Sequence, residues 1–311
     1  MKRKMISKTA ELVNNYKKDI YYYNSARDAF LNILNEYNKK MKVTLLLPGY
    51  IGVSPNEGSG IFDPVLSSEI KYQFYEMNND LTINVDEFNK LIASTDNKVI
   101  VLFVHYFGYV DKNIELLVGK CREREAIIIE DAAHALYTDY IDHACGQYGD
   151  YVLYSLHKML PFKTGGMLKV NCNQKINITG KEHSLISPFG YDLYQIAQQR
   201  KSNARLWNEL LLEHDRSIEI LRPYSDKETP QTFPIVVKNY DRNQLYFKLN
   251  EAGYGAVSLY HTMIDEIKQS KNESAVWLSQ HIINMPVHQD VEENEIKKMA
   301  KLLISIVESE L

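Results

Sequence analysis

The sequence predicts an α/β protein built on a largely parallel sheet, and two observations carry that prediction. Short runs of mostly apolar residues recur along the first half of the chain, at 43–47, 99–104 and 126–130. Between them lie segments whose apolar residues repeat at helical spacing, at 86–93 and 112–124. Continuous apolar strands that alternate with helices are typical of a parallel sheet that is buried on both faces.

The expected elements of this part follow one another in a regular order. They are a helix at 5–20, a helix from 24, strands at 43–47 and 70–77, a helix at 86–93, a strand at 99–104, a helix at 112–124 and strands at 126–130 and 151–155. The second helix has a start signal, because Asn24 or Ser25 can accept hydrogen bonds from its first N–H groups. Proline and glycine within 52–64 predict a loop.

The last third of the chain has a different pattern. A long helix is expected at 193–212, strands at 231–237 and 255–259, and helices at 243–252 and 293–307. Two strands with flanking helices predict a small α+β domain. We therefore expect a large domain at 1–190, followed by an interdomain helix and a small C-terminal domain at 191–311.

Composition narrows the class of protein. The 311 residues are 45% hydrophobic and 24% charged, with a formal charge of -4. That balance offers no basic field for a phosphate backbone, so nucleic acid is not an expected partner. The apolar runs are far shorter than the roughly 20 residues that a membrane helix needs, so no membrane partner is expected either. Cys121, Cys145 and Cys172 form no CxxC pair, which suits a cytoplasmic protein.

Common phosphate and metal motifs are missing. Residues 58–60 do not extend to a complete GxGxxG, and no glycine-lysine-serine or glycine-lysine-threonine string supports a P-loop. His143 lies near Cys145 and His134 near Asp139, but neither spacing matches a zinc framework. No metal site is predicted.

Asp131 and Lys158 are the pair of residues most suggestive of chemistry. Ligands of parallel sheets bind at the carboxyl ends of the strands, and both residues directly follow an expected strand. A carboxylate in that buried place needs a cation, and a protonated pyridine nitrogen is one candidate. The turn from Ser155 to Lys158 can place a hydroxyl on a phosphate and an amine on an aldehyde of one pyridoxal phosphate (PLP). A helix cap or ion pair for Asp131, and a solvated Lys158, remain the alternatives.

Several strings together resemble one family. Val104-His-Tyr-Phe-Gly108, Ile129-Glu-Asp-Ala-Ala-His134, Gly149-Asp-Tyr-Val-Leu-Tyr-Ser155 and Gly165-Gly166 occur in the order found in DegT/StrS-type sugar aminotransferases. These are PLP-dependent enzymes of fold type I. The resemblance runs from about residue 24 to the C-terminus. It implies a large domain with a mostly parallel sheet and a small C-terminal α+β domain.

The resemblance also implies roles for single residues around the cofactor ring. Lys158 matches the lysine that is covalently linked to the cofactor, with Lys163 as a rival that lies too close to the glycines. Asp131 matches the partner of the pyridine nitrogen. His134 matches a position near the ring, with a structural histidine as the alternative, and Ser155 matches the phosphate-binding serine.

Four further positions and one histidine follow from the same match. Ser25, Ala26 and Arg27 stand where the family has Ser-Gly-Thr, at a helix N-terminus whose N–H groups hold phosphate. Tyr50 is expected to supply an aromatic ring stacked on the cofactor. His105 either faces the site or merely ends its strand.

The sequence departs from the family in two informative places. The segment between Ser155 and Lys158 is a couple of residues shorter than is typical. The Gly-x-Asn-Tyr-Arg segment, which normally sends an Asn to the neighbouring subunit's phosphate, has no counterpart, and residues 187–191 lead almost directly to Arg200. The chain therefore resembles a shortened branch, and Arg27 is the expected substitute for the missing Asn.

The activity implied by the resemblance is amino transfer. The amino group would move from an amino acid such as glutamate to a keto sugar, expected to be nucleotide-linked, for surface polysaccharide or amino-sugar biosynthesis. A homodimer is implied as well. Two alternatives stay open. One is a PLP-dependent sugar dehydratase, in which histidine replaces the lysine, and the other is a non-catalytic regulatory or scaffold protein.

Overall fold

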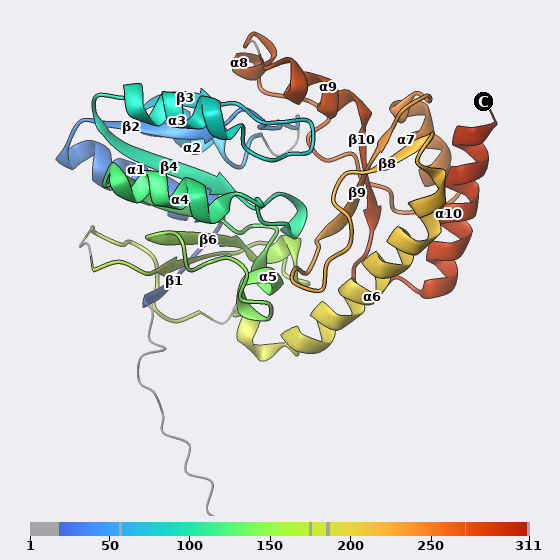
Figure 1. Ribbon diagram of the computed structural model, residues 1–311. Helices are drawn as coiled ribbons and strands as arrows, with labels where there is room; N and C mark the ends of the chain where they lie inside the picture. Colours follow the sequence, from blue (N-terminus) through green and yellow to red (C-terminus); the bar gives the residue numbers. More distant parts are fainter. Residues whose placement is uncertain (1–18, 56–57, 174–175, 185–186, 271, 310–311) are drawn as a thin grey trace, which may run out of the picture.

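A seven-stranded sheet forms the centre of the first part of the molecule (Figure 1). The computed structural model describes residues 19–55, 58–173, 176–184, 187–270 and 272–309. The strands are β1 (Asp19–Tyr23), β2 (Val43–Pro48), β3 (Lys71–Tyr75), β4 (Lys98–Val104), β5 (Ile127–Asp131), β6 (Tyr151–Ser155) and β7 (Gly166–Val170). Their order is β1-β7-β6-β5-β4-β2-β3, and the five neighbours from β6 to β3 are parallel. The predicted α/β class is confirmed.

Helices connect and cover these strands. They are α1 (Ala26–Lys40), α2 (Phe62–Ser68), α3 (Val85–Ser94), α4 (Ile114–Glu123) and α5 (Leu136–Tyr140). Helix α1 packs against α2, β6 and β7, whereas α3 and α4 pack against each other. Strand β2 is buried along its whole length, as its apolar sequence requires. The predicted cap is confirmed, since the Ser25 hydroxyl accepts a hydrogen bond from Asp28 N.

Two predictions at the antiparallel edge of the sheet are wrong or incomplete. The helix expected at 5–20 lies mostly outside the described residues, and its last two residues, Asp19 and Ile20, belong to strand β1. Strand β7 was not expected, because it begins at glycine and is short. The two strands pair with each other in antiparallel register, from Asp19 opposite Val170 to Tyr23 opposite Gly166. Pairing across the edge decides their structure, and local sequence does not show it.

A smaller antiparallel sheet organises the C-terminal part (Figure 1). Its strands are β8 (Ile218–Ile220), β9 (Thr232–Val237) and β10 (Ile282–Pro286), in the order β10-β9-β8. The helices of this part are α6 (Leu193–Leu211), α7 (Arg242–Glu251), α8 (Asp265–Lys268), α9 (Glu273–His281) and α10 (Glu293–Glu308). Trp207, Phe233, Leu249 and Leu303 belong to its own buried core. The expected α+β character is confirmed.

The strand predicted at 255–259 does not form. Val257 makes an isolated bridge with Asn284, and the chain then leaves the small sheet. It reaches the large sheet instead, where Met263, Ile264 and Leu278 are part of the first hydrophobic core. The division at 190 therefore stays a prediction, because residues beyond it help to build both cores. Among the described residues, no helix has the length and apolar character to cross a membrane.

Candidate active site

A cavity of about 510 Å³ opens at the carboxyl edge of the large sheet, a size in the usual range for small-molecule sites. Its walls come from the N-terminus of α1, residues 51–54 and 58–61, the ends of β4 and β5, the turn after β6 and the segment 258–261. The residues of the prediction that line it are Ser25, Ala26, Arg27, His105, Asp131, His134, Ser155 and Lys158. The topology therefore brings together residues that are far apart in the sequence, as expected for a parallel sheet.

Asp131 ends strand β5, and its half-buried side chain lines this cavity. One carboxylate oxygen accepts a hydrogen bond of 2.9 Å from Ala133 N. Burial raises the pKa of Asp131, while the positive charge of Lys158 and the Ala133 N–H act in the opposite direction. A cationic N–H group bound in the cavity would favour the charged carboxylate. The side chain thus fits the partner of a protonated ring nitrogen.

Lys158 lies directly after strand β6, in a short 3-10 turn over Leu156–Lys158. Its Nζ is 3.0 Å from Nε2 of His134. The other ring nitrogen of His134 accepts a hydrogen bond of 3.2 Å from Phe107 N. Burial, followed by the nearby charge of Lys158, holds the pKa of His134 well below its ordinary value. The imidazole is therefore neutral near pH 7. The hydrogen bond from Phe107 N fixes its orientation, so that Nε2 faces the Lys158 amine.

The N-terminus of helix α1 forms another wall, and the start of strand β7 positions it. A Cβ on Gly166 would lie 2.2 Å from the Ser25 carbonyl carbon and 2.4 Å from Ala26 N, so a side chain has no room there. Thr164 Oγ1 also donates to Asn24 O at 2.6 Å. The glycine that the sequence singled out thus lets β7 seat a helix N-terminus in the cavity, a place suited to an anion.

Two predicted phosphate-side residues have partners within the protein. Ser155 Oγ lies 3.3 Å from His157 Nδ1, beside Lys158. Arg27 lies 3.5 Å from Asp63 Oδ2, and the same oxygen accepts a hydrogen bond of 3.0 Å from Ser59 N. Because the Arg27 side chain is 42% exposed, this ion pair is screened by solvent. Arg27 is thereby held at the rim of the cavity.

Tyr50 is not among the residues that line the cavity. Its side chain is fully buried, and its ring centroid lies 5.4 Å from that of Tyr260, which does line the cavity. The Tyr106 hydroxyl donates to Tyr50 O and fixes the loop in this position. The structure therefore gives Tyr50 a place in the supporting core. Tyr260 was not predicted as a site residue, because it directly follows residues 255–259, which were expected to form a strand of the small sheet.

His105 belongs to a buried hydrogen-bond network beside the cavity. Its Nε2 lies 2.8 Å from Glu130 Oε2, and Glu130 also accepts hydrogen bonds from Gly146 N and Gly149 N. Burial would raise the pKa of Glu130, but His105 and the two N–H groups outweigh it and lower the pKa. With Cys145, these side chains place three possible metal ligands within 4.8 Å. Since both Glu130 oxygens already accept hydrogen bonds, the cluster serves as a structural network.

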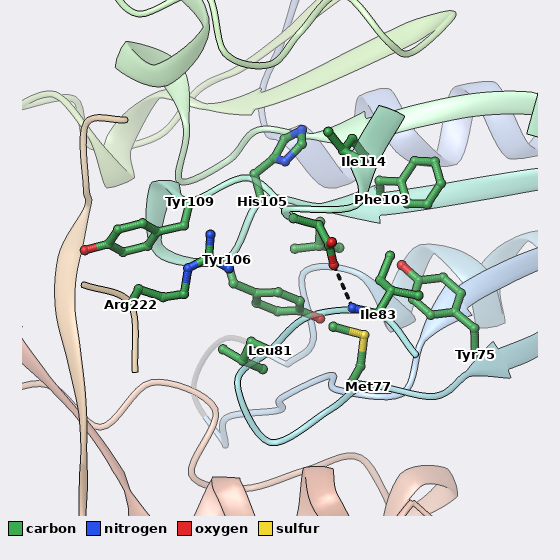
Figure 2. Close-up of a pocket in the computed structure, with 12 residues that line it drawn as sticks. Tyr75, Met77, Leu81, Ile83, Phe103, His105, Tyr106, Tyr109, Ile114 and Arg222 are labelled. Atoms are coloured by element: carbon green, nitrogen blue, oxygen red, sulfur yellow. Dashed lines mark hydrogen bonds between the residues drawn. The ribbon is translucent and has the colours of Figure 1, made fainter. Parts of the chain in front are cut away.

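A second and far smaller cavity has His105 in its lining. Figure 2 shows Tyr106 and Tyr109 on one side of it, with Arg222 and Met77 nearby. Its volume of about 10 Å³ suffices for one water molecule at most. No cofactor would fit this space, so the larger cavity is the candidate active site.

Comparison with known proteins finds a similarity to one family. Residues 60–178 match the family model described as the DegT/DnrJ/EryC1/StrS aminotransferase family. This matched segment is less than half of the chain. The matched segment contains strand β5 with Asp131 and the turn with Lys158, so the family match and the site geometry coincide.

The family match extends to a curated relative. Over 89 residues the chain is 33% identical to the spore coat polysaccharide biosynthesis protein SpsC of Bacillus subtilis. This alignment covers 28% of the chain and 23% of SpsC, so the chain matches less than a quarter of that relative's length.

Solved structures share the fold over nearly the whole chain. PseC of Helicobacter pylori, an aminotransferase involved in pseudoaminic acid biosynthesis, has a TM-score of 0.74 at 17% identity, covering 93% of this chain and 87% of PseC. A putative sugar aminotransferase of Streptococcus pneumoniae in its PLP form has a TM-score of 0.73 at 15% identity, covering 94% and 88%. GDP-4-keto-6-deoxy-D-mannose-3-dehydratase of E. coli has a TM-score of 0.71 at 16% identity, covering 91% and 87%. The chain therefore has the fold of PLP-dependent aminotransferases, fold type I.

Proposed function

We propose that the protein is a PLP-dependent aminotransferase that moves an amino group from an amino acid to a keto sugar. The observation that carries this proposal is the meeting of Asp131, Lys158 and the N-terminus of α1 in one cavity. When bound, PLP supplies an electron sink for the carbon that carries the amino group. The three features fit its ring nitrogen, its aldehyde and its phosphate in turn.

Each side chain has a defined task in this proposal. Asp131 holds a proton on the ring nitrogen, because a carboxylate with a raised pKa gains from a cationic partner. Lys158 anchors the cofactor and then moves a proton through Nζ between the donor carbon and the cofactor. His134 orients that amine through its Nε2 edge. Ser155, together with Ser25, Ala26 and Arg27, binds the phosphate.

The substrates follow from the family and its relatives. We propose a nucleotide-linked keto sugar as acceptor and glutamate as donor, in surface polysaccharide or amino-sugar biosynthesis. The similarity to a spore coat polysaccharide protein supports the polysaccharide part. A cytoplasmic location is part of the proposal, supported by three free cysteines.

A homodimer is proposed as the working assembly. Exposed aromatic side chains follow the place of the missing family segment, with Phe189 at 47%, Tyr191 at 39% and Tyr194 at 64% exposure. The Phe189 ring packs on Tyr140, and the Tyr191 ring packs on Phe162. Aromatic contacts within the chain therefore hold these two exposed rings in position. Light scattering should give twice the chain mass. A strict monomer with full activity would contradict this assembly.

The dehydratase alternative remains in view because a dehydratase shares the fold. Retention of Lys158 beside His157 favours amino transfer.

The experiment that tests amino transfer mixes the purified protein with PLP and glutamate and measures 2-oxoglutarate and pyridoxamine phosphate. Stoichiometric formation of both supports the proposal, and Lys158→Ala is the matched control. PLP binding without either product, under any of several amino acid donors, would contradict amino transfer, and failure to bind PLP would favour a non-catalytic role.

A further inference from the structure

Tyr260 holds an unusual backbone conformation at the wall of the cavity. Its φ is 59°, in the left-handed region, which a large side chain adopts rarely and which glycine favours. Strained residues of this kind persist where the surrounding structure holds them, and they gather at ligand sites. Tyr260 lines the same cavity as Asp131, His134 and Lys158.

Backbone contacts with the loop after β2 hold Tyr260 in place. Val53 N donates to Thr262 O at 2.9 Å, and Ile264 N donates to Ile51 O at 3.0 Å. These two bonds flank an isolated bridge between Gly52 and Met263. A segment of the C-terminal part is thereby fastened across the strand end of the large sheet, beside the predicted cofactor.

Gly52 leaves the space that the Tyr260 ring occupies. A Cβ on Gly52 would lie 2.8 Å from Tyr260 Cδ1 and 3.0 Å from Tyr260 Cα. Gly52 is outside the left-handed region, so its backbone does not demand glycine. The lack of a side chain at 52 and the presence of the ring at 260 are therefore complementary.

The ring stands in an aromatic group that opens on one side to the cavity. Its centroid lies 5.5 Å from that of Tyr106, 5.8 Å from that of Phe107 and 6.2 Å from that of His134. Burial raises the pKa of the Tyr260 hydroxyl, and the Asp131 charge adds to this, so the phenol is neutral and close to that carboxylate. Tyr260 lines the cavity together with Asp131, the proposed partner of the ring nitrogen.

We propose that Tyr260 is the aromatic residue that packs against the cofactor ring, supplied by the C-terminal part of the chain in place of a side chain at residue 52. This inference rests on the proposed function, because it assumes that the cavity binds PLP. It assigns to residue 260 the contact that sequence comparison placed at Tyr50. It also makes the docked segment at 260–264 part of the cofactor site.

The test measures the PLP dissociation constant of the apoprotein by equilibrium dialysis, together with visible circular dichroism of the bound cofactor. Tyr260→Gly removes the ring while suiting the backbone at this φ, and Tyr260→Phe keeps the ring. We expect Tyr260→Gly to weaken PLP binding about tenfold, the order of one aromatic contact, and Tyr260→Phe to stay within about twofold. The visible dichroism should fall in Tyr260→Gly alone. Gly52→Phe in the Tyr260→Gly background should recover at least about a third of the lost affinity on a logarithmic scale.

The outcomes separate this inference from the proposed function. If the parent protein does not bind PLP, the proposed function fails. If the parent binds PLP but Tyr260→Gly binds equally well or more tightly, the Tyr260 assignment is wrong. An equal loss of PLP affinity in Tyr260→Phe would show that the hydroxyl, and not the ring, makes the contact, and would overturn the inference. No recovery by Gly52→Phe would overturn the replacement of a residue 52 side chain. Thermal unfolding of each apoprotein controls for folding.

Discussion

Lys158 Nζ lies 3.0 Å from His134 Nε2, and the opposite ring nitrogen of His134 accepts the Phe107 N–H. The low pKa of His134, caused by burial and then by the Lys158 charge, leaves the ring neutral with a single N–H. Since Nδ1 accepts, that hydrogen belongs on Nε2 and points at Lys158. Lys158 Nζ can accept this hydrogen only in its unprotonated form, which is the form that reacts with an aldehyde.

His134→Leu should slow the capture of PLP by the apoprotein at pH 7. We expect about a fivefold effect, the order of one neutral hydrogen bond. Stopped-flow absorbance of the lysine-linked cofactor measures the rate. His134→Gln keeps an N–H donor and serves as the control. Its rate of PLP capture should lie between the rates of the parent and of His134→Leu. An unchanged rate in His134→Leu would show that the contact does not prepare the amine.

Asp131→Asn should leave some PLP bound but strongly reduce amino transfer. The ring nitrogen would lose its ionic partner, and removal of one member of a buried charge pair costs about 3–5 kcal/mol. The half-reaction with glutamate should fall by two orders of magnitude or more. Asp131→Glu keeps the charge and should retain more activity. Near-parental rates in Asp131→Ala would refute the role of Asp131.

Arg27→Ala should weaken PLP binding several-fold, because a charge-assisted contact to the phosphate is lost. Asp63→Asn is the matched variant. It removes the 3.5 Å partner of Arg27 without removing the guanidinium, so it should leave binding unchanged or tighter. Isothermal titration of the apoproteins measures both. Equal affinity in Arg27→Ala and the parent would mean that other groups replace the missing cross-subunit Asn.

Glu130→Gln should lower the free energy of unfolding by about 3 kcal/mol at pH 7, because the buried carboxylate loses its pairing with His105. The lowered pKa of Glu130 means that its contribution to stability is complete above the ordinary value of 4.5 and is lost as pH falls through the lower folded value. Urea unfolding from pH 7 to pH 3 tests this. The variant should lack that part of the acid dependence. If the free energy of unfolding of the parent and of Glu130→Gln falls equally with decreasing pH, other carboxylates cause the acid dependence.

The centre of the sheet could be predicted because β2, β4 and β5 consist mostly of apolar residues. Strands β4 and β5 are buried on both faces, and such runs are visible without any knowledge of the fold. The neighbouring ends of β5 and β6 also placed Asp131 and Lys158 in one site, since parallel strands end at one edge.

Features that depend on distant pairing could not be predicted in this way. Strand β1 pairs with β7, a strand that begins 143 residues after β1 ends, and this pairing is not visible in the local sequence. Tyr260 reaches the cavity through backbone bonds to residues 51–53, so nothing in its local sequence indicates a site. Tyr50 directly precedes Ile51, which lines the cavity, but its own side chain is fully buried beside Tyr106 and Tyr260.

The most direct test of the account is the position of the covalently bound cofactor. The purified protein is incubated with PLP, reduced with borohydride and digested, and the modified peptide is sequenced by mass spectrometry. We expect one adduct, on Lys158, and no adduct in Lys158→Ala. An adduct on Lys163 or Lys169 instead, or one that persists in Lys158→Ala at the parental level, would contradict it.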